Sequence, residues 1–378
     1  MRLLYLSNST LPGEEANGVH VMRMCEALAP RVEGLRLVAR MPRGGDPGGA
    51  GLASHYGLDR EIDCVRYRRR RWSDRMVMWR QRWWRPDVMC GRSPELLRYN
   101  RRCPFVLELH MLPSCKGPEA GRLLRTLLGS PLLLGAVVIS EALKEALVGE
   151  TGLDRSRVWV LPDGAKPAGR AGTRVLDRRR GGDLIAGYAG SLLPGKGMEV
   201  IAEIAGLGAN ATFHVVGGQP EEVERWRRDP RCAGVVFHGR VPPGEVAAYI
   251  AAFDVCLLPN QREVLTRGGE DIGRFTSPLK LFEYMAAGKA ILASDLPVMR
   301  EVINEEVAMM VSPDDPDGWA EGLKRLADAR LRGELGQAAL RLFERGYSWE
   351  ARADTLLRII REGLEERFSE GAAEARGR

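Results

Sequence analysis

The chain has 378 residues, of which 44% are hydrophobic and 28% are charged. This length suggests two domains, and the composition is typical of a globular protein. No apolar run approaches the roughly 20 residues that a membrane-crossing helix needs, and the N-terminus carries no secretory cleavage site. The seven cysteines are scattered without a C-x-x-C pair, and none of the five histidines has a partner at ligand spacing. We therefore expect free thiols and no zinc site.

In the first half of the chain, short apolar segments alternate with helical ones, which predicts parallel βαβ units. The last three of these strands precede a stretch, residues 163–182, that is rich in glycine and arginine and reads as an interdomain linker. The expected strands are Leu3–Ser7, Leu35–Ala39, Asp87–Cys90, Phe105–His110, Ala136–Ser140 and Val158–Pro162.

The second half repeats the alternation and ends in an amphipathic helix from Trp349 to about Phe368. The sequence thus predicts an α/β protein with two Rossmann-like, doubly wound domains. We expect residues 1–165 as the first domain, 166–182 as linker, 183–348 as the second domain, and 349–378 packing back on the first. The expected strands of the second domain are Leu184–Ala189, Thr212–Val216, Val235–His238, Val255–Pro259, Ala290–Ala293 and Ala308–Val311.

The segment from Thr276 to Gly288 has residues that favour the start and the end of a helix. Thr276 or Ser277 suits the N-cap, Pro278 the first helical position and Gly288 the C-terminal cap. A hydroxyl cap, free N–H groups and the positive end of the helix dipole together favour an anion. Lys280 adds a full charge in the first turn, and Glu283 follows one turn later on the same face. A phosphate bound at Lys280 and a ribose bound at Glu283 would together be part of a nucleoside diphosphate.

This segment, S-P-x-K-x-x-E-Y-M-A-A-G-K followed by a strand and S-D-L-P, resembles the donor-site helix of family-four retaining glycosyltransferases. The resemblance implies the GT-B fold, in which two Rossmann-like domains face each other across a cleft. Thr276, Ser277, Leu279, Lys280 and Glu283 are then candidate donor-binding residues. The family often carries two glutamates as E-x7-E, and this chain has Phe275 at the first position. Glu263, Glu270 or Asp271 are candidate substitutes in the preceding loop.

A second segment, LIAGYAGSLLPGKGMEV, predicts a strand, a glycine-rich turn and a helix. Gly190 permits close approach of a ligand, and Lys196 precedes a helix N-terminus where it can pair with phosphate. The segment resembles the G-x-L-x-x-x-K-G phosphate loop of the same family, with Ser191 where an arginine often stands. By the same resemblance, the backbone at Arg240 and Val241 meets the nucleobase.

The first domain supplies three further candidates. Gly18, at the start of a helix, resembles the glycine whose loop brings N–H groups to the diphosphate, whereas His20 inside that helix is interpreted as structural. His110 stands at the carboxyl end of a buried strand, and FVLELHMLP is similar to the v-x-E-x-H segment of the family. The resemblance implies that His110 contacts the donor sugar. Glu108, on the same face, would orient His110 or contact the acceptor.

The net charge of +6 is unevenly spread, because residues 66–85 contain nine arginines and one acid, Asp74. At helical spacing Trp72, Met76, Trp79 and Trp83 form one stripe among these arginines. One interpretation is a helix that packs this aromatic face on its own domain. The other is an interfacial helix that docks on anionic lipid head groups. Nucleic acid is disfavoured, because no nucleic-acid-binding fold accompanies the patch.

Together these features predict a retaining, metal-independent hexosyltransferase. It would transfer a sugar from a nucleotide-diphosphate sugar, with no resident cofactor, to a glycan or lipid-linked glycan in cell-envelope polysaccharide biosynthesis. His110, Lys196 and Glu283 are the expected catalytic residues. We expect a cytoplasmic protein with peripheral contact, through Arg66–Arg85, to the inner face of the membrane. The alternatives are a GT-B nucleotide-sugar epimerase, and a non-catalytic nucleotide-sugar-binding subunit.

Overall fold

The computed structural model describes residues 1–13, 15–43, 51–68, 72–167, 169, 176–177, 184–209 and 211–376. It divides into two compact units, one formed by Met1–Pro162 with Trp349–Arg378 and the other by Asp163–Ser348. The expected domain boundary after residue 165 therefore lies three residues too late. Ala165 belongs with the second unit, since its N–H donates to the Tyr347 carbonyl over 3.0 Å. Most of the expected linker, residues 166–182, lies outside the described residues.

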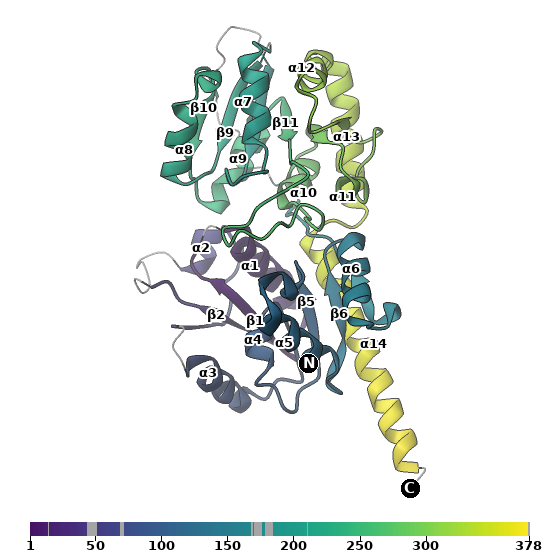
Figure 1. The fold of residues 1–378 in the computed structure, drawn as a ribbon. Coiled ribbons are helices and arrows are strands. Elements are labelled where there is room, and N and C mark those ends of the chain that lie inside the picture. Colours follow the sequence, from purple (N-terminus) through teal and green to yellow (C-terminus); the bar gives the residue numbers. More distant parts are fainter. Residues whose placement is uncertain are drawn as a thin grey trace. The chain divides into compact units, whose positions relative to one another are not determined.

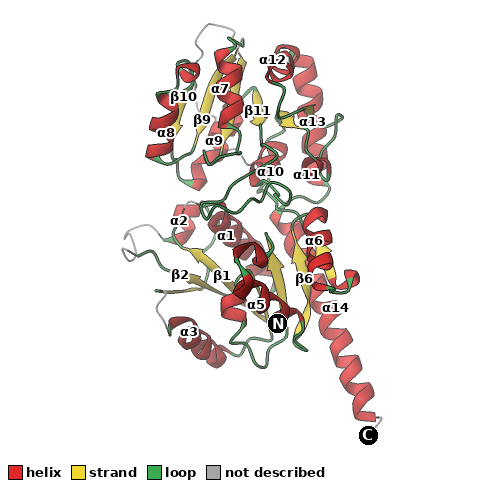
Figure 2. Ribbon diagram, viewed as in Figure 1, coloured by secondary structure: helices red, strands yellow, loops and turns green. Residues whose placement is uncertain are grey.

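The first unit is built on a parallel sheet of seven strands in the order β3-β2-β1-β4-β5-β6-β7, with helices on both faces (Figures 1 and 2). Near-continuous apolar runs explain the central strands, which are buried on both sides. The strands are β1 (Arg2–Thr10), β2 (Gly34–Arg40), β3 (Cys64–Tyr67), β4 (Val88–Gly91), β5 (Phe105–Leu109), β6 (Leu133–Val138) and β7 (Val158–Val160). The helices are α1 (Ala16–Leu28), α2 (Leu52–Tyr56), α3 (Ser73–Gln81), α4 (Pro94–Leu97), α5 (Pro118–Leu128), α6 (Glu141–Thr151) and α14 (Trp349–Arg376).

The C-terminal helix α14 packs against α1 and β6 of the first unit (Figure 1). Its buried stripe includes Ala353, Leu356, Leu357 and Ile360, which are at most 1% exposed. The apolar periodicity in the sequence accounts for this stripe. The helix extends beyond Phe368, where the sequence pattern ended.

The second unit contains a parallel sheet of six strands in the order β10-β9-β8-β11-β12-β13. Apolar clusters cover both of its faces, so this unit is doubly wound as expected. Its strands are β8 (Leu184–Ala189), β9 (Ala211–Val216), β10 (Val236–Gly239), β11 (Val255–Leu258), β12 (Ala290–Ser294) and β13 (Met309–Val311). Its helices are α7 (Met198–Gly206), α8 (Pro220–Arg227), α9 (Val246–Ala252), α10 (Leu279–Ala286), α11 (Pro297–Arg300), α12 (Pro316–Arg325) and α13 (Ala329–Glu344).

The twelve expected strands are all present, with ends that differ from the expected ones by at most three residues, and the structure adds the edge strand β3. Among the described residues, none of the helices is both long enough and apolar enough to pass through a bilayer. All seven cysteines are free thiols, five of them buried.

Candidate functional site

In the second unit, two lysines converge beside the carboxyl end of β8. The Lys280 Nζ donates to the hydroxyl of Tyr188 over 2.9 Å and lies 4.1 Å from the centre of its ring. A Cβ on Gly190 would lie 3.4 Å from the same Nζ. Lys196 stands just before Gly197, the N-cap of α7. The carboxyl ends of parallel strands are where open α/β sheets bind ligands, so both lysines lie at the expected edge.

Both lysines are held in surroundings that disfavour their charge. Burial lowers the pKa of Lys196 to about 8. Burial, followed by repulsion from Lys196, lowers the pKa of Lys280 well below its ordinary value, and the Glu283 carboxylate opposes this shift. Lys280 is only 7% exposed. A buried and a half-buried lysine with one half-buried carboxylate nearby form a site that gains free energy when an anion enters.

The loop between β8 and α7 is shaped by close backbone approaches. A Cβ on Gly195 would lie 1.8 Å from the carbonyl oxygen of Glu263, and its φ of +78° is one that glycine adopts readily. The Tyr188 hydroxyl donates to the carbonyl of Ser191 over 2.7 Å. Tyr188 thus connects the phosphate-type loop to Lys280, and sequence reasoning missed this residue.

The structure corrects the expected capping of α10. The N-cap residue is Pro278, and neither Thr276 nor Ser277 caps the helix with its side chain. Ser277 Oγ instead accepts the N–H of Asp163 over 3.0 Å, and Thr276 is buried. Ser277 Oγ thus has a partner distant in sequence rather than a local one in the first turn of α10. Gly288, with φ of +61°, ends the helix as expected, and Leu279 and Glu283 are half-buried.

The remaining candidates of this unit lie in loops. Arg240 follows β10 and donates to Gln219 Oε1 over 2.9 Å, while the neighbouring Val241 packs on the core. In the loop before α10, the Asp271 carboxylate accepts the N–H groups of Val264 and Gly273 over 2.9 and 2.8 Å. Glu270 accepts a hydrogen bond from Thr266, whereas Glu263 is exposed. Asp271 and Glu270 thus shape their own loop, which makes Glu263 the more available candidate for the role lost at Phe275.

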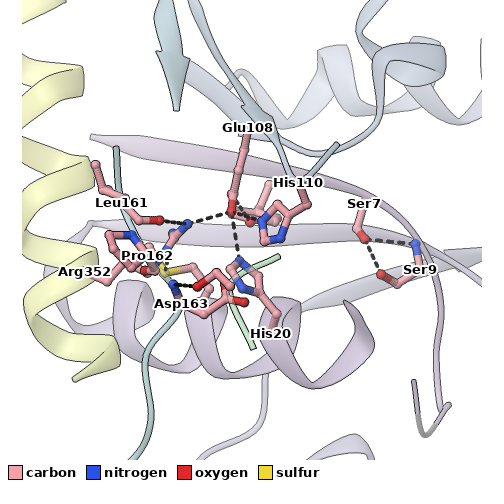
Figure 3. Close-up of polar contacts among 12 residues, drawn as sticks. Ser7, Ser9, His20, Glu108, His110, Leu161, Pro162, Asp163 and Arg352 are labelled. Atoms are coloured by element: carbon pink, nitrogen blue, oxygen red, sulfur yellow. Dashed lines mark hydrogen bonds and ion pairs between the residues drawn. The ribbon is translucent and has the colours of Figure 1, made fainter. Parts of the chain in front are cut away.

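In the first unit, donors from several segments converge on a buried carboxylate, and Figure 3 shows His20, His110 and Arg352 around it. Glu108 is 1% exposed and lies on β5, two residues before His110. Its Oε2 accepts the Tyr5 hydroxyl over 2.6 Å. Its Oε1 accepts Nε2 of His110 over 2.9 Å and a guanidinium N–H of Arg352 over 3.0 Å, and Nε2 of His20 lies 2.9 Å away. Glu108 and His110 therefore share a face, as their spacing predicted.

This cluster keeps Glu108 charged. Burial opposes ionisation, but the Arg352 charge, the His20 charge and the hydrogen bonds from both imidazoles together hold the pKa of Glu108 well below its usual range. The three atoms of His20, Glu108 and His110 lie within 4.8 Å of one another, a spacing that a metal ion can use. Since the Arg352 guanidinium already contacts the same carboxylate oxygen, a second cation there would be repelled.

Gly18 has a packing explanation in the structure. It lies in the first turn of α1, and its N–H donates to the Glu15 carbonyl over 2.9 Å. A Cβ at this position would lie 3.1 Å from the Tyr56 hydroxyl. That hydroxyl also donates to the Gly13 carbonyl over 2.6 Å. The contact of Gly18 with a diphosphate, implied by the family resemblance, stays a prediction.

The arginine-rich stretch departs from the interpretation that its aromatic stripe packs on the domain. Trp72, Met76, Trp79 and Trp83 are 63%, 59%, 56% and 78% exposed. The helix α3 buries its opposite face, with Val77, Met78 and Gln81 inside. The aromatic stripe is thus left on the surface, and the packing interpretation was wrong. Arg69–Arg71 lie outside the described residues.

Comparison with known proteins gives these sites a context. Residues 183–329 match the family described as glycosyl transferases group 1. The chain is 26% identical over 298 residues to D-inositol 3-phosphate glycosyltransferase of Acidothermus cellulolyticus, covering 70% of this chain and 63% of that protein. It is 29% identical over 175 residues to phosphatidyl-myo-inositol mannosyltransferase of Mycobacterium tuberculosis, covering 44% and 43%. The chain thus spans less than two thirds of either relative.

The fold has a close counterpart among solved structures. Sucrose-phosphate synthase from Thermosynechococcus elongatus superposes with a TM-score of 0.71 at 17% identity, covering 97% of this chain and all of that one. This similarity shows the GT-B fold, with two Rossmann-like domains, as the sequence predicted.

Proposed function

We propose, on the premise that residues 183–329 form a domain of the group 1 glycosyltransferase family, that the chain transfers a hexose from a nucleotide-diphosphate sugar to an acceptor with retention of configuration. The observation that carries this proposal is the pair Lys196 and Lys280. Their charges are disfavoured by burial at the ligand-binding edge of the second sheet. A diphosphate entering there would restore both charges, and the same charges would stabilise it as a leaving group.

Other residues take roles consistent with this arrangement. Glu283, one turn after Lys280 on α10, accepts hydrogen bonds from the ribose diol. The backbone at Arg240 and Val241 meets the base, and Gly190 and Ser191 allow the phosphates to approach. Because two lysines and two helix N-termini supply the positive charge, the transfer is proposed to proceed without a metal ion or a resident cofactor.

The acceptor belongs to the first unit in this proposal. His110 contacts the donor sugar near the reacting carbon, and Glu108 orients it. A glycan or lipid-linked glycan of the cell envelope is the proposed acceptor. This choice is supported by a relative named for phosphatidyl-myo-inositol, and by another named as a putative teichuronic acid biosynthesis glycosyltransferase from Bacillus subtilis.

A screen of nucleoside diphosphates by thermal denaturation tests the donor site. We expect one nucleoside diphosphate to raise the melting temperature of the wild type, and no increase in Lys280→Met. The sugar donors of that nucleotide are then assayed for product by mass spectrometry. Transfer that is unchanged in Lys280→Met and Glu283→Ala would contradict the site assignment. An isomerised donor without any transfer product would identify an epimerase instead.

A peripheral membrane position is the second part of the proposal. The exposed aromatic stripe adjoins a pocket of about 450 Å³ that is lined by Arg36, Arg66 and Arg80 together with Met76. Tryptophan side chains at the interface with arginines beside them match the chemistry of an anionic bilayer surface. The α3 surface, meaning this stripe and the pocket, is therefore proposed to dock on anionic lipid.

Vesicle sedimentation tests the α3 surface. We expect the wild type to bind vesicles containing phosphatidylglycerol and to bind phosphatidylcholine vesicles much less. Trp79→Ser with Trp83→Ser should reduce binding at least tenfold. Leu207→Ser is the matched control, because Leu207 is a 56% exposed apolar side chain in the other unit. Equal binding by the double variant and the control would overturn the docking proposal.

A further inference from the structure

The chain crosses between the two units twice, after Pro162 and again before Trp349. Arg352, one turn into α14, contacts the first of these crossings. Its Nε donates to the Pro162 carbonyl over 2.9 Å, and its Nη2 donates to the Leu161 carbonyl over 3.2 Å and to Glu108 Oε1 over 3.0 Å (Figure 3). Arg352 is 4% exposed. A charged side chain at such a depth is retained only where its donors are satisfied.

A neighbouring residue of α14, Trp349, contacts one of the two imidazoles. The Trp349 ring meets the edge of His20 with centroids 5.0 Å apart, and His20 in turn meets His110 at 4.6 Å. His20 and His110 each bring Nε2 to within 2.9 Å of Glu108 Oε1. Four chain segments, which lie far apart in the sequence, therefore determine how His110 is held.

A histidine that donates from Nε2 to a carboxylate keeps its proton on that nitrogen, so that Nδ1 is the acceptor nitrogen of the ring. This tautomer requires that the carboxylate stays ionised. It also requires that the carboxylate does not draw a second proton onto the imidazole. A fixed positive charge in contact with the same carboxylate oxygen meets both requirements, because it repels protons from the whole cluster.

We infer that Arg352 is a positioning residue of the His110 site, which holds His110 neutral with its proton on Nε2 by neutralising the Glu108 carboxylate. The inference rests on the proposed function for the role of His110 in sugar transfer. The protonation state of the His110 ring does not depend on that function. Arg352 would touch neither donor nor acceptor. Its effect passes through Glu108 to His110.

The other titratable groups around Glu108 do not supply this charge. Tyr5 on β1, Cys25 on α1 and Cys90 on β4 all face the carboxylate, and burial raises the pKa of each well above its ordinary value. They are neutral across the working pH range. Arg92 is the further cation near Tyr5, and it acts on that hydroxyl. His20 on α1 also faces the carboxylate, with Nε2 2.9 Å from Glu108 Oε1, and its charge adds to that of Arg352 in lowering the pKa of Glu108. Arg352 is thus the permanent cation that contacts the carboxylate.

The test compares Arg352→Met with Arg352→Lys, which keeps the charge. Arg358→Met is the control, because Arg358 is exposed on the same helix and pairs with Glu362. Histidine NMR on ¹⁵N-labelled protein reports the tautomer and the pH at which His110 takes up a proton. We expect the Nε2–H tautomer in the wild type and an uptake midpoint at least one pH unit higher in Arg352→Met. Arg352→Lys should return the midpoint most of the way, and Arg358→Met should leave it unchanged.

Activity gives a second readout. The acid limb of the kcat profile should move to higher pH in Arg352→Met by the same amount, while the donor KM stays within about twofold. A purely structural role would lower kcat at every pH without shifting the acid limb of the profile. Superimposable limbs, or an unchanged NMR midpoint, would overturn the inference. The NMR midpoint does not depend on sugar transfer, so an absence of transfer in the wild type would contradict the proposed function alone.

Discussion

The two candidate sites treat buried charge in opposite ways. In the first unit, Glu108 is surrounded by donors and its ionised form is stabilised inside the protein. In the second unit, burial opposes the charges of Lys196 and Lys280, and Glu283 is the carboxylate that offsets it for Lys280. The first arrangement is complete without a ligand. The second is unfavourable until an anion arrives, which is what a site that binds and releases a diphosphate requires.

This contrast predicts opposite effects on stability, and the largest is at Glu108. Glu108→Gln should lower the free energy of unfolding by about 3 to 5 kcal/mol, because it leaves the buried Arg352 without its counter-charge. Urea denaturation measures this loss. The control Glu362→Gln removes an exposed carboxylate from an ion pair on α14 and should cost less than about 1 kcal/mol. A Glu108→Gln protein as stable as this control would show that the cluster is not preorganised around an ionised Glu108.

Lys280→Met should have little effect on stability but a large effect on activity. Removing a buried amine whose charge is already disfavoured leaves the unliganded protein as stable as the wild type or more so. Transfer should fall by about 10² to 10³, equivalent to about 3 to 4 kcal/mol of lost leaving-group stabilisation. Lys324→Met, which removes an exposed lysine on α12, should retain full activity. A strongly destabilised Lys280→Met protein would remove the distinction between the two sites.

The strands and the nucleotide motifs could be read from the sequence because they depend on local patterns. Buried parallel strands are apolar runs, and Gly190, Lys196, Lys280 and Glu283 lie close to such runs in sequence. The edge strand Cys64–Tyr67 was missed because half-exposed arginine and tyrosine interrupt its pattern. Tertiary contacts could not be predicted from local patterns either. One of them lies at the start of α10, where Ser277 Oγ accepts the N–H of Asp163.

The Glu108 cluster shows the same limit. Tyr5, His20 and Arg352 come from positions more than 80 residues from Glu108, and no spacing rule connects them. One signal was present for Arg352, which lies four residues before Leu356 and therefore on the apolar stripe of its helix. A lone charge on a buried helix face indicates a buried partner. The sequence could not say which acid that partner is.

The pH dependence of nucleotide binding sharpens the contrast further. An anion binds best to protonated lysines, and burial lowers the pKa of Lys196 to about 8 in the unliganded protein. The contribution of Lys196 to affinity should be nearly constant below pH 7 and fall by up to about tenfold per pH unit above pH 8. Calorimetry in buffers of different ionisation enthalpy should detect proton uptake on binding at pH 8. Lys196→Met should reduce the loss of nucleotide affinity above pH 8.

The sign of the linkage to folding is the reverse. The depressed lysine pKa means that the unfolded chain binds more protons than the folded one between about pH 8 and the ordinary lysine value. Lys196 therefore makes the unliganded protein more stable as the pH rises through that window. Loss of nucleotide affinity without this gain in stability would place the titrating group elsewhere.

The smallest predicted effect is that of Gly18→Ala, which tests whether Gly18 takes part in donor binding. A methyl group at this position would crowd the Tyr56 hydroxyl at 3.1 Å, while alanine is better than glycine inside a helix by about 1 kcal/mol. Gly18→Ala should therefore change stability by less than about 1 kcal/mol. In a Tyr56→Phe background the close oxygen is gone, so the alanine should become more favourable by a few tenths to 1 kcal/mol. If glycine is required only for this packing, any loss of donor affinity caused by Gly18→Ala should disappear when Tyr56→Phe is added to the same protein. A donor KM that stays raised in the double variant would mean that donor binding itself needs the space at Gly18.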